Sequence, residues 1–152
     1  MTTPSKTTAE IGLDQMLCFA VYKAEQAFNR VYRHALEPLG LTYPQFLTMR
    51  LLWNAGSLSV GEISERLGLD SGTVTPLLKR LTLMGLVKKA RRADDERRVD
   101  IFLTDQGRAL ETKSEAVMQC IAQAIAVDGR EGEDMLMTIN RLTANLSEAA
   151  ER

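Results

Sequence analysis

The sequence predicts a mainly α-helical protein that carries one small β-hairpin. Two short amphipathic segments, 59–67 and 70–84, are joined by a glycine turn, and residues 86–103 read as two apolar strands around a charged loop. Long helical patterns lie on either side, at 11–36 and 108–150. Together these observations predict a winged helix-turn-helix attached to a helical dimerisation platform.

The first helical pattern covers residues 11–36. Its apolar positions recur every three or four residues, at Leu17, Val21, Ala24, Phe28, Val31 and Ala35. A helix of about 26 residues would span roughly 39 Å, which is long for one small domain. We therefore expect part of its apolar face to pack at a dimer interface.

The segments that follow carry strong helix-boundary signals. Thr42 is a plausible N-cap for the next helix, which ends at Gly56. Ser59 and Glu62 form the pattern of a capping box, and Gly68 stands where a left-handed C-terminal glycine belongs. The second short helix then begins with Asp70 or Ser71 as its cap and stops at Gly85.

The predicted hairpin is the basic part of the chain. Between residues 71 and 100, eight basic and four acidic side chains give a net charge of +4, whereas the whole chain has −1. A local basic patch on a mildly acidic protein indicates binding to DNA. The alternative is a charged hairpin that only faces water.

The remainder of the chain predicts an antiparallel helix pair. Thr104–Gly107 begins the first helix, a turn falls at 128–132, and apolar stripes follow on both sides of it. We expect a single domain over residues 1–152, with dimerisation helices at 11–38 and 108–150 and the winged unit at 43–104. A two-fold homodimer would place two reading helices one DNA turn apart, roughly 34–36 Å, over pseudo-palindromic double-stranded operator DNA.

Composition argues against several other classes of protein. No run is apolar enough to span a membrane and no signal peptide opens the chain, so we expect a cytoplasmic protein whose cysteines are reduced at rest. The chain has one histidine, no Cys-x-x-Cys pair and no glycine-rich phosphate loop. We therefore expect it to bind neither a metal nor a cofactor. Nothing prepares a thiol for turnover, so a thiol peroxidase is the weaker alternative and we expect no enzyme.

The hairpin motif resembles the signature of the MarR family of bacterial winged-helix regulators. Asp95-Glu96-Arg97 is followed by Leu103-Thr104 and then Gly107. The helical order on both sides agrees with that family over essentially the whole chain. The resemblance implies a homodimeric repressor that binds operator DNA.

The first helix resembles one branch of that family, the organic hydroperoxide regulators. The similar segment is 13–22, which contains Cys18, and residues 70–78 resemble the reading helix of the same branch. The resemblance implies that an organic hydroperoxide oxidises Cys18 and that Cys120 of the partner subunit acts as the resolving thiol. It also implies a sensing pocket formed by Phe19, Tyr22, Tyr32 and Tyr43.

Helix geometry limits how that pocket can form. Tyr32 follows Cys18 by 14 residues, or about 21 Å along a helix axis, so the two side chains cannot touch within one subunit. If both line one pocket, Tyr32 must come from the partner, and Tyr43 would arrive from the same direction. Their hydroxyl groups could then stabilise a thiolate by hydrogen bonding.

The predicted DNA contacts divide into three groups. Asp70, Ser71, Thr73 and Thr75 lie on the early turns of the reading helix, where side chains reach base edges. Lys79 and Arg80 are expected at phosphates. At the hairpin, Arg97 would enter the minor groove with Asp95 holding its direction, and Arg91 and Arg92 would add supporting charge.

Two alternatives remain open. Each cysteine could be a small buried hydrophobe, as cysteines on apolar helix faces usually are. The runner-up function is a MarR-type repressor that binds a small aromatic ligand and has inert cysteines.

Overall fold

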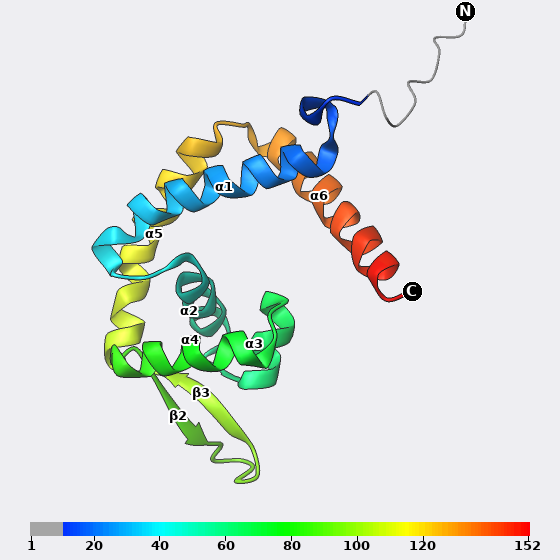
Figure 1. Ribbon diagram of the computed structural model, residues 1–152. Helices are drawn as coiled ribbons and strands as arrows, with labels where there is room; N and C mark the ends of the chain where they lie inside the picture. The colour runs from blue at the N-terminus through cyan, green and yellow to red at the C-terminus, as the bar shows by residue number, and fades with distance from the viewer. Residues whose placement is uncertain (1–10) are drawn as a thin grey trace, which may run out of the picture.

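The computed structural model describes residues 11–152 and shows six helices longer than one turn with a small sheet (Figure 1). The element order is η2 (Leu13–Gln15), α1 (Leu17–Leu36), η3 (Glu37–Leu39), α2 (Tyr43–Ala55), β1 (Ser57–Ser59), α3 (Val60–Leu67), α4 (Ser71–Leu83), β2 (Val87–Arg91), β3 (Val99–Leu103), α5 (Asp105–Ile125) and α6 (Gly129–Ala150). The predicted fold class, mainly α with a winged helix-turn-helix, is confirmed. Residues 1–10, which belong to the predicted single domain, lie outside the described residues.

Local caps start and stop the helices of the winged unit. The Ser59 backbone N–H donates to Glu62 Oε2 at 2.8 Å and the Glu62 N–H donates to Ser59 Oγ at 3.1 Å, which is a complete capping box. Gly68 ends α3 with φ of 64°, in the left-handed region that glycine adopts without strain. Asp70 caps α4 because its Oδ1 accepts from the Thr73 N–H at 2.8 Å, so Asp70 rather than Ser71 is the cap.

The sheet has three antiparallel strands in the order β1-β3-β2. In its register Leu58 lies opposite Ile101 and Val87 opposite Leu103, and these side chains are buried. The sequence prediction of a two-stranded hairpin therefore missed β1. A strand of three residues carries no usable alternation, and its partner lies about forty residues further along the chain.

One core holds the winged unit together. Phe46, Met49 and Leu52 of α2 are buried with Ile63 of α3 and Val74 of α4. Helices α3 and α4 both pack against α2. The orientation of the reading helix α4 is therefore fixed by the rest of the domain.

The N-terminal segment differs from the predicted continuous helix over 11–36. A short 3-10 turn occupies Leu13–Gln15, Met16 is extended with φ −86° and ψ 120°, and α1 begins only at Leu17. Its 20 residues span about 30 Å. The apolar spacing continues across the break at Met16, so periodicity could not reveal it.

The predicted antiparallel pair at the C-terminus is wrong in two respects. The turn lies at 126–128, where Ala126 takes a left-handed conformation with φ 54° and Asp128 Oδ1 accepts from the Glu131 N–H at 2.8 Å. Helix α5 packs along α1, but α6 extends away from α5 and buries none of its residues (Figure 1). Both segments are amphipathic helices as predicted, but α5 packs on α1 and not on α6.

Over residues 11–152, no helix combines the length and the apolar character needed to cross a membrane.

Candidate DNA-binding interface and thiol site

Helix α4 presents one face to the core and the other to solvent. Val74, Leu77, Leu78 and Leu81 are buried. The predicted contact residues all lie on the exposed side: Asp70, Ser71, Thr73, Thr75, Lys79 and Arg80. The Asp70 carboxylate is partly used by its cap bond to Thr73, so its first role is to begin the helix.

Pro76 lies inside α4 without interrupting it. The helix runs from Ser71 to Leu83 with this proline in its interior. Proline has no N–H, so the usual hydrogen bond to the Gly72 carbonyl is missing. The loss falls on the exposed side of the helix, where water can satisfy the carbonyl, and the buried face stays intact.

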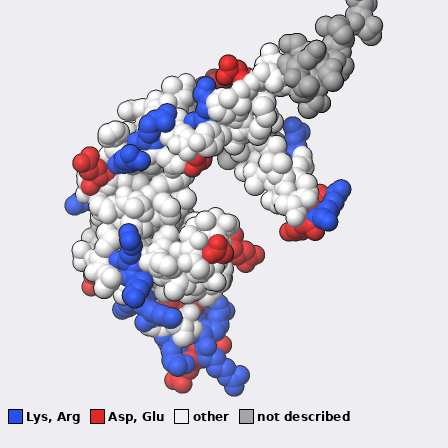
Figure 2. Space-filling model, viewed as in Figure 1, with Lys and Arg blue, Asp and Glu red and all other residues white. Residues whose placement is uncertain are grey.

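The hairpin and α4 form one basic surface. Figure 2 shows Lys and Arg gathered over this end of the molecule, with Asp and Glu interspersed near the hairpin tip. The exposed basic residues are Lys79, Arg80, Lys88, Lys89, Arg91, Arg97 and Arg98, and Arg92 is half-buried. The charge predicted from sequence is therefore assembled on a continuous face.

The arginines of the hairpin are not equivalent. Arg91 donates to the Glu96 carbonyl at 2.7 Å, and Arg98 lies 3.5 Å from Glu62 on α3. Within residues 11–152, the Arg97 guanidinium has neither a hydrogen bond nor an ion pair. Asp95 accepts from the Arg97 backbone N–H at 3.0 Å, so it fixes the main chain and not the guanidinium as the sequence suggested.

Arg92 has a different environment from the one expected for a supporting surface charge. Its guanidinium donates to both oxygens of Asp94, at 2.8 and 3.0 Å, and lies 3.6 Å from Asp100. These carboxylates raise the pKa of Arg92, chiefly through the hydrogen bonds from Asp94. Asp100 was not found from the sequence, although an acidic residue inside an apolar strand was an available signal.

Both cysteines are free and exposed. Cys18 lies in the first turn of α1 and Cys120 lies towards the end of α5. The two thiols are not close to one another in a single chain. An exposed thiol is unusual because cysteine is among the most buried residue types.

The residues of the predicted pocket form two separate clusters in one chain. Near Cys18, the rings of Phe19 and Tyr22 lie 6.3 Å apart, and Lys23 Nζ lies 5.5 Å from the Phe19 ring centroid. Lys23 was not predicted from the sequence, although its spacing of four from Phe19 indicates such a contact.

The second cluster lies at the other end of α1. Tyr32 and Tyr43 stack with ring centroids 4.0 Å apart, and Tyr32 is buried. Burial, with a smaller contribution from Tyr43, raises the pKa of Tyr32 from 10.0 to about 12. Its hydroxyl therefore stays protonated at neutral pH and can act as a hydrogen-bond donor.

A close junction connects α5 to the reading helix. Thr104 caps α5 and its hydroxyl donates to the Gly85 carbonyl at the end of α4, at 2.6 Å. A Cβ atom on Gly107 would lie 2.0 Å from the Leu86 carbonyl oxygen, so only glycine permits this approach. Gly85 and Gly107, which the sequence marked as helix boundaries, therefore also lie at the contact between the end of α4 and the start of α5.

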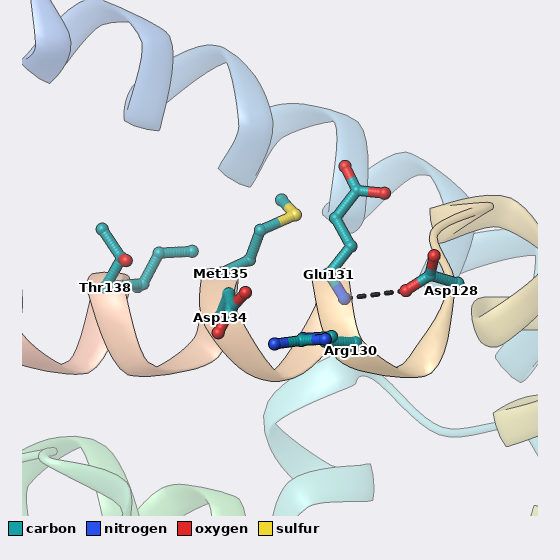
Figure 3. Close-up of a pocket in the computed structure, with 7 residues that line it drawn as sticks. Asp128, Arg130, Glu131, Asp134, Met135 and Thr138 are labelled. Atoms are coloured by element: carbon teal, nitrogen blue, oxygen red, sulfur yellow. Dashed lines mark hydrogen bonds between the residues drawn. The ribbon is translucent and has the colours of Figure 1, made fainter.

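A hollow lies along the first turns of α6. Its volume is about 580 Å³, and Asp128, Glu131, Met135 and Ile139 are among its lining residues. Figure 3 shows the Asp128–Glu131 cap bond and the Met135 side chain pointing towards the neighbouring helix. The hollow is open to solvent because α6 buries none of its residues.

A family model described as "MarR family" matches residues 41–99. The chain is 54% identical over 114 residues to the HTH-type transcriptional regulator TtmR of Methylorubrum extorquens (strain PA1), and the match covers 75% of this chain and 56% of TtmR. It is 38% identical over 123 residues to the organic hydroperoxide resistance transcriptional regulator of Bacillus subtilis (strain 168), covering 81% and 82% of the two chains.

A solved structure shows the same fold. The chain superposes on the structure of reduced AbfR bound to DNA with a TM-score of 0.75 and 32% sequence identity, and the match covers 90% of this chain and 93% of that one. AbfR is a protein of Staphylococcus epidermidis.

Proposed function

This chain belongs to the MarR family of DNA-binding transcriptional regulators, and we propose that it is a homodimeric repressor that releases its operator when an organic hydroperoxide oxidises Cys18. The observation that carries the proposal is the exposure of Cys18 and Cys120 on helices that also expose apolar side chains. A structural cysteine would be buried within its own chain. Thiols left on an open apolar surface are available both to an apolar oxidant and to a second subunit.

The dimer is proposed from the apolar surface that one chain leaves open. On α1, Leu17 is 64% exposed, and on α6 Leu136 and Met137 are 60% and 70% exposed. Soluble monomers rarely expose contiguous apolar patches of this kind. A second copy that packs on α1 and α6 would cover these side chains and fill the hollow beside Met135 (Figure 3).

The proposed DNA contacts follow the exposed face of α4 and the hairpin. Ser71, Thr73 and Thr75 would reach base edges, and Lys79, Arg80 and Arg91 would lie at phosphates. Asp70 would begin the reading helix and could accept from a cytosine. Arg97 would enter the minor groove, because its guanidinium has no partner within the described chain.

The proposed chemistry at Cys18 balances without a cofactor. The thiolate attacks the peroxide oxygen, the O–O bond breaks, and the alkoxide leaves as an alcohol after taking a proton, so Cys18 becomes a sulfenic acid. The Cys120 thiol of the partner then attacks the sulfenic sulfur, forming a disulfide and releasing water. Phe19 and its apolar neighbours favour an alkyl or lipid hydroperoxide over hydrogen peroxide.

The proposed pocket needs two chains. Phe19 and Tyr22 lie beside Cys18, whereas the Tyr32–Tyr43 stack lies at the other end of α1. An antiparallel copy of α1 would bring the stack of one subunit towards the thiol of the other. Tyr32 would then donate to the thiolate, since its pKa of about 12 keeps it protonated.

The test is binding to a labelled duplex that the wild-type protein selects from a randomised pool, with and without cumene hydroperoxide. Wild-type protein should release the duplex on oxidation, and Cys18→Ser should stay bound. Non-reducing electrophoresis should show a linked dimer that Cys120→Ser abolishes. Release from DNA without any linked species would reject the disulfide step, and release by Cys18→Ser would reject Cys18 as the sensor.

The runner-up is regulation by a small aromatic ligand with inert cysteines. An apolar groove of about 220 Å³ between α1 and α5, lined in part by Phe28, Val31 and Ile121, favours it. This hypothesis predicts that Cys18→Ser responds like wild-type protein to every effector. The same binding experiment therefore separates the ligand-binding repressor from the thiol-based one.

A further inference from the structure

Arginine side chains in and beside the loop between β2 and β3, residues 92–98, bind to other groups of the same chain. Arg91 donates to the Glu96 carbonyl within this loop, and Arg98 pairs with Glu62 on α3 at 3.5 Å. The Arg92 N–H donates to the Arg98 carbonyl at 2.9 Å and closes the loop at its base. Arg97 is left at the tip with its backbone held by Asp95.

Asp100 is a buried carboxylate beneath this loop. It is 1% exposed and lies in β3 between Ala90 of β2 and Ser59 of β1. Its Oδ1 has no hydrogen-bond partner among residues 11–152. A buried carboxylate without a counter-charge is strongly unfavourable, so something must neutralise it.

Arg92 supplies that charge and joins it to the loop. Its Nη1 lies 3.6 Å from Asp100 Oδ2. Its Nε and Nη2 donate to the two oxygens of Asp94, at 2.8 and 3.0 Å. One guanidinium therefore connects the buried strand to the exposed turn, with its Nε and Nη2 already hydrogen-bonded to one carboxylate and its Nη1 paired with another.

We propose that Arg92 is a positioning residue of the DNA-binding interface, which neutralises Asp100 and fixes the 92–98 loop so that Arg97 is presented to the duplex. This replaces the direct supporting contact that the sequence suggested for Arg92. The inference rests on the proposed function, since it needs Arg97 to meet DNA. A loop that is already ordered loses less conformational freedom on binding, so the anchored loop binds more tightly than a mobile one.

The test separates a phosphate contact from a positioning role. Binding to the selected duplex is measured over a series of potassium chloride concentrations, because each neutralised phosphate contributes about 0.9 to the slope of log K against log salt. The variants are Arg92→Gln, Asp100→Asn, the double variant and Arg97→Gln. Arg152→Gln is the matched control, because this exposed arginine lies at the C-terminal end of α6, far from the hairpin (Figure 1).

We expect Arg97→Gln to reduce the slope and Arg152→Gln to leave it unchanged. Arg92→Gln should weaken binding by a similar factor at every salt concentration, with the wild-type slope, and should lower the melting temperature. Adding Asp100→Asn should restore the melting temperature, because it removes the buried charge that has lost its partner. The affinity should stay reduced, because the guanidinium that joins β3 to Asp94 is still absent.

An Arg92→Gln slope reduced as much as that of Arg97→Gln, with no rescue of the melting temperature by Asp100→Asn, would overturn the inference and make Arg92 a phosphate contact. A wild-type protein that enriches no duplex from the randomised pool at low salt would overturn the proposed function itself. The two failures are therefore distinguishable.

Discussion

The indole Nε1–H of Trp53 donates to the carbonyl oxygen of Gly107 at 2.9 Å. This bond joins α2, the central helix of the winged unit, to the first turn of α5. The same turn touches the end of the reading helix, where the Thr104 hydroxyl donates to the Gly85 carbonyl. A change in the position of α5 would therefore be transmitted to α4 through directional hydrogen bonds and a tight backbone contact.

Gly107→Ala should destabilise the protein. The new methyl carbon would lie 2.0 Å from the Leu86 carbonyl oxygen, and backbone cannot move aside cheaply. We expect a loss of roughly 1–3 kcal/mol in the free energy of unfolding, measured by urea denaturation. Gly61→Ala is the control, because its methyl group would meet nothing nearer than 3.9 Å and alanine favours a helix. Equal stability of the two variants would contradict the packing described here.

Glu62→Gln should change how stability depends on acid pH. Hydrogen bonds from the Ser59 backbone and hydroxyl, with Arg98 nearby, lower the pKa of Glu62 from its usual 4.5. A carboxyl group whose folded pKa is depressed stabilises the fold above its unfolded pKa, and this contribution is lost as pH falls through the folded value. The difference in unfolding free energy between wild type and variant should therefore shrink below about pH 4.5. Glu65→Gln on the same helix is the control, and an identical pH profile for both variants would refute the assignment.

Tyr32→Phe should reduce the loss of stability at alkaline pH. The pKa of Tyr32 is about 12 in the folded chain against 10.0 for an ordinary tyrosine, so the unfolded chain loses its proton first. The contribution of this group is fully present below pH 10 and is lost as pH rises towards 12. The free energy of unfolding, measured in urea across this pH range, should fall more steeply with pH for wild type than for Tyr32→Phe. Tyr22→Phe, which removes an exposed hydroxyl, should keep the wild-type profile.

Substitutions on the exposed face of α4 should separate sequence reading from phosphate binding. Thr75→Ala should relax the preference at one base pair by about 1–3 kcal/mol, measured by competition among single-base variants of the selected duplex. Lys79→Gln should weaken binding to all duplexes alike and reduce the salt slope by about 0.9 for each phosphate lost. The opposite pattern would exchange the two assigned roles.

Much of the winged unit could be predicted from the sequence because its signals are local. The Ser59–Glu62 box, Gly68, Asp70 and Thr104 each act within four residues along the chain, and each lies where it was expected. The charge of the hairpin is likewise a property of one continuous segment. The apolar stripes of α1 and α4 were also legible, because the side-chain period follows from helix geometry.

The tertiary structure alone decided which groups meet. The strand β1, the Tyr32–Tyr43 stack and the Arg92–Asp100 pair all depend on how separate elements are oriented. Apolar spacing predicts that a helix face is covered but does not predict which element covers it. In the structure α5 packs on α1, whereas α6 buries none of its residues. Sequence therefore determined the elements and their caps, since these depend on neighbouring residues, and the fold determined the contacts, since these depend on distances that no local pattern records.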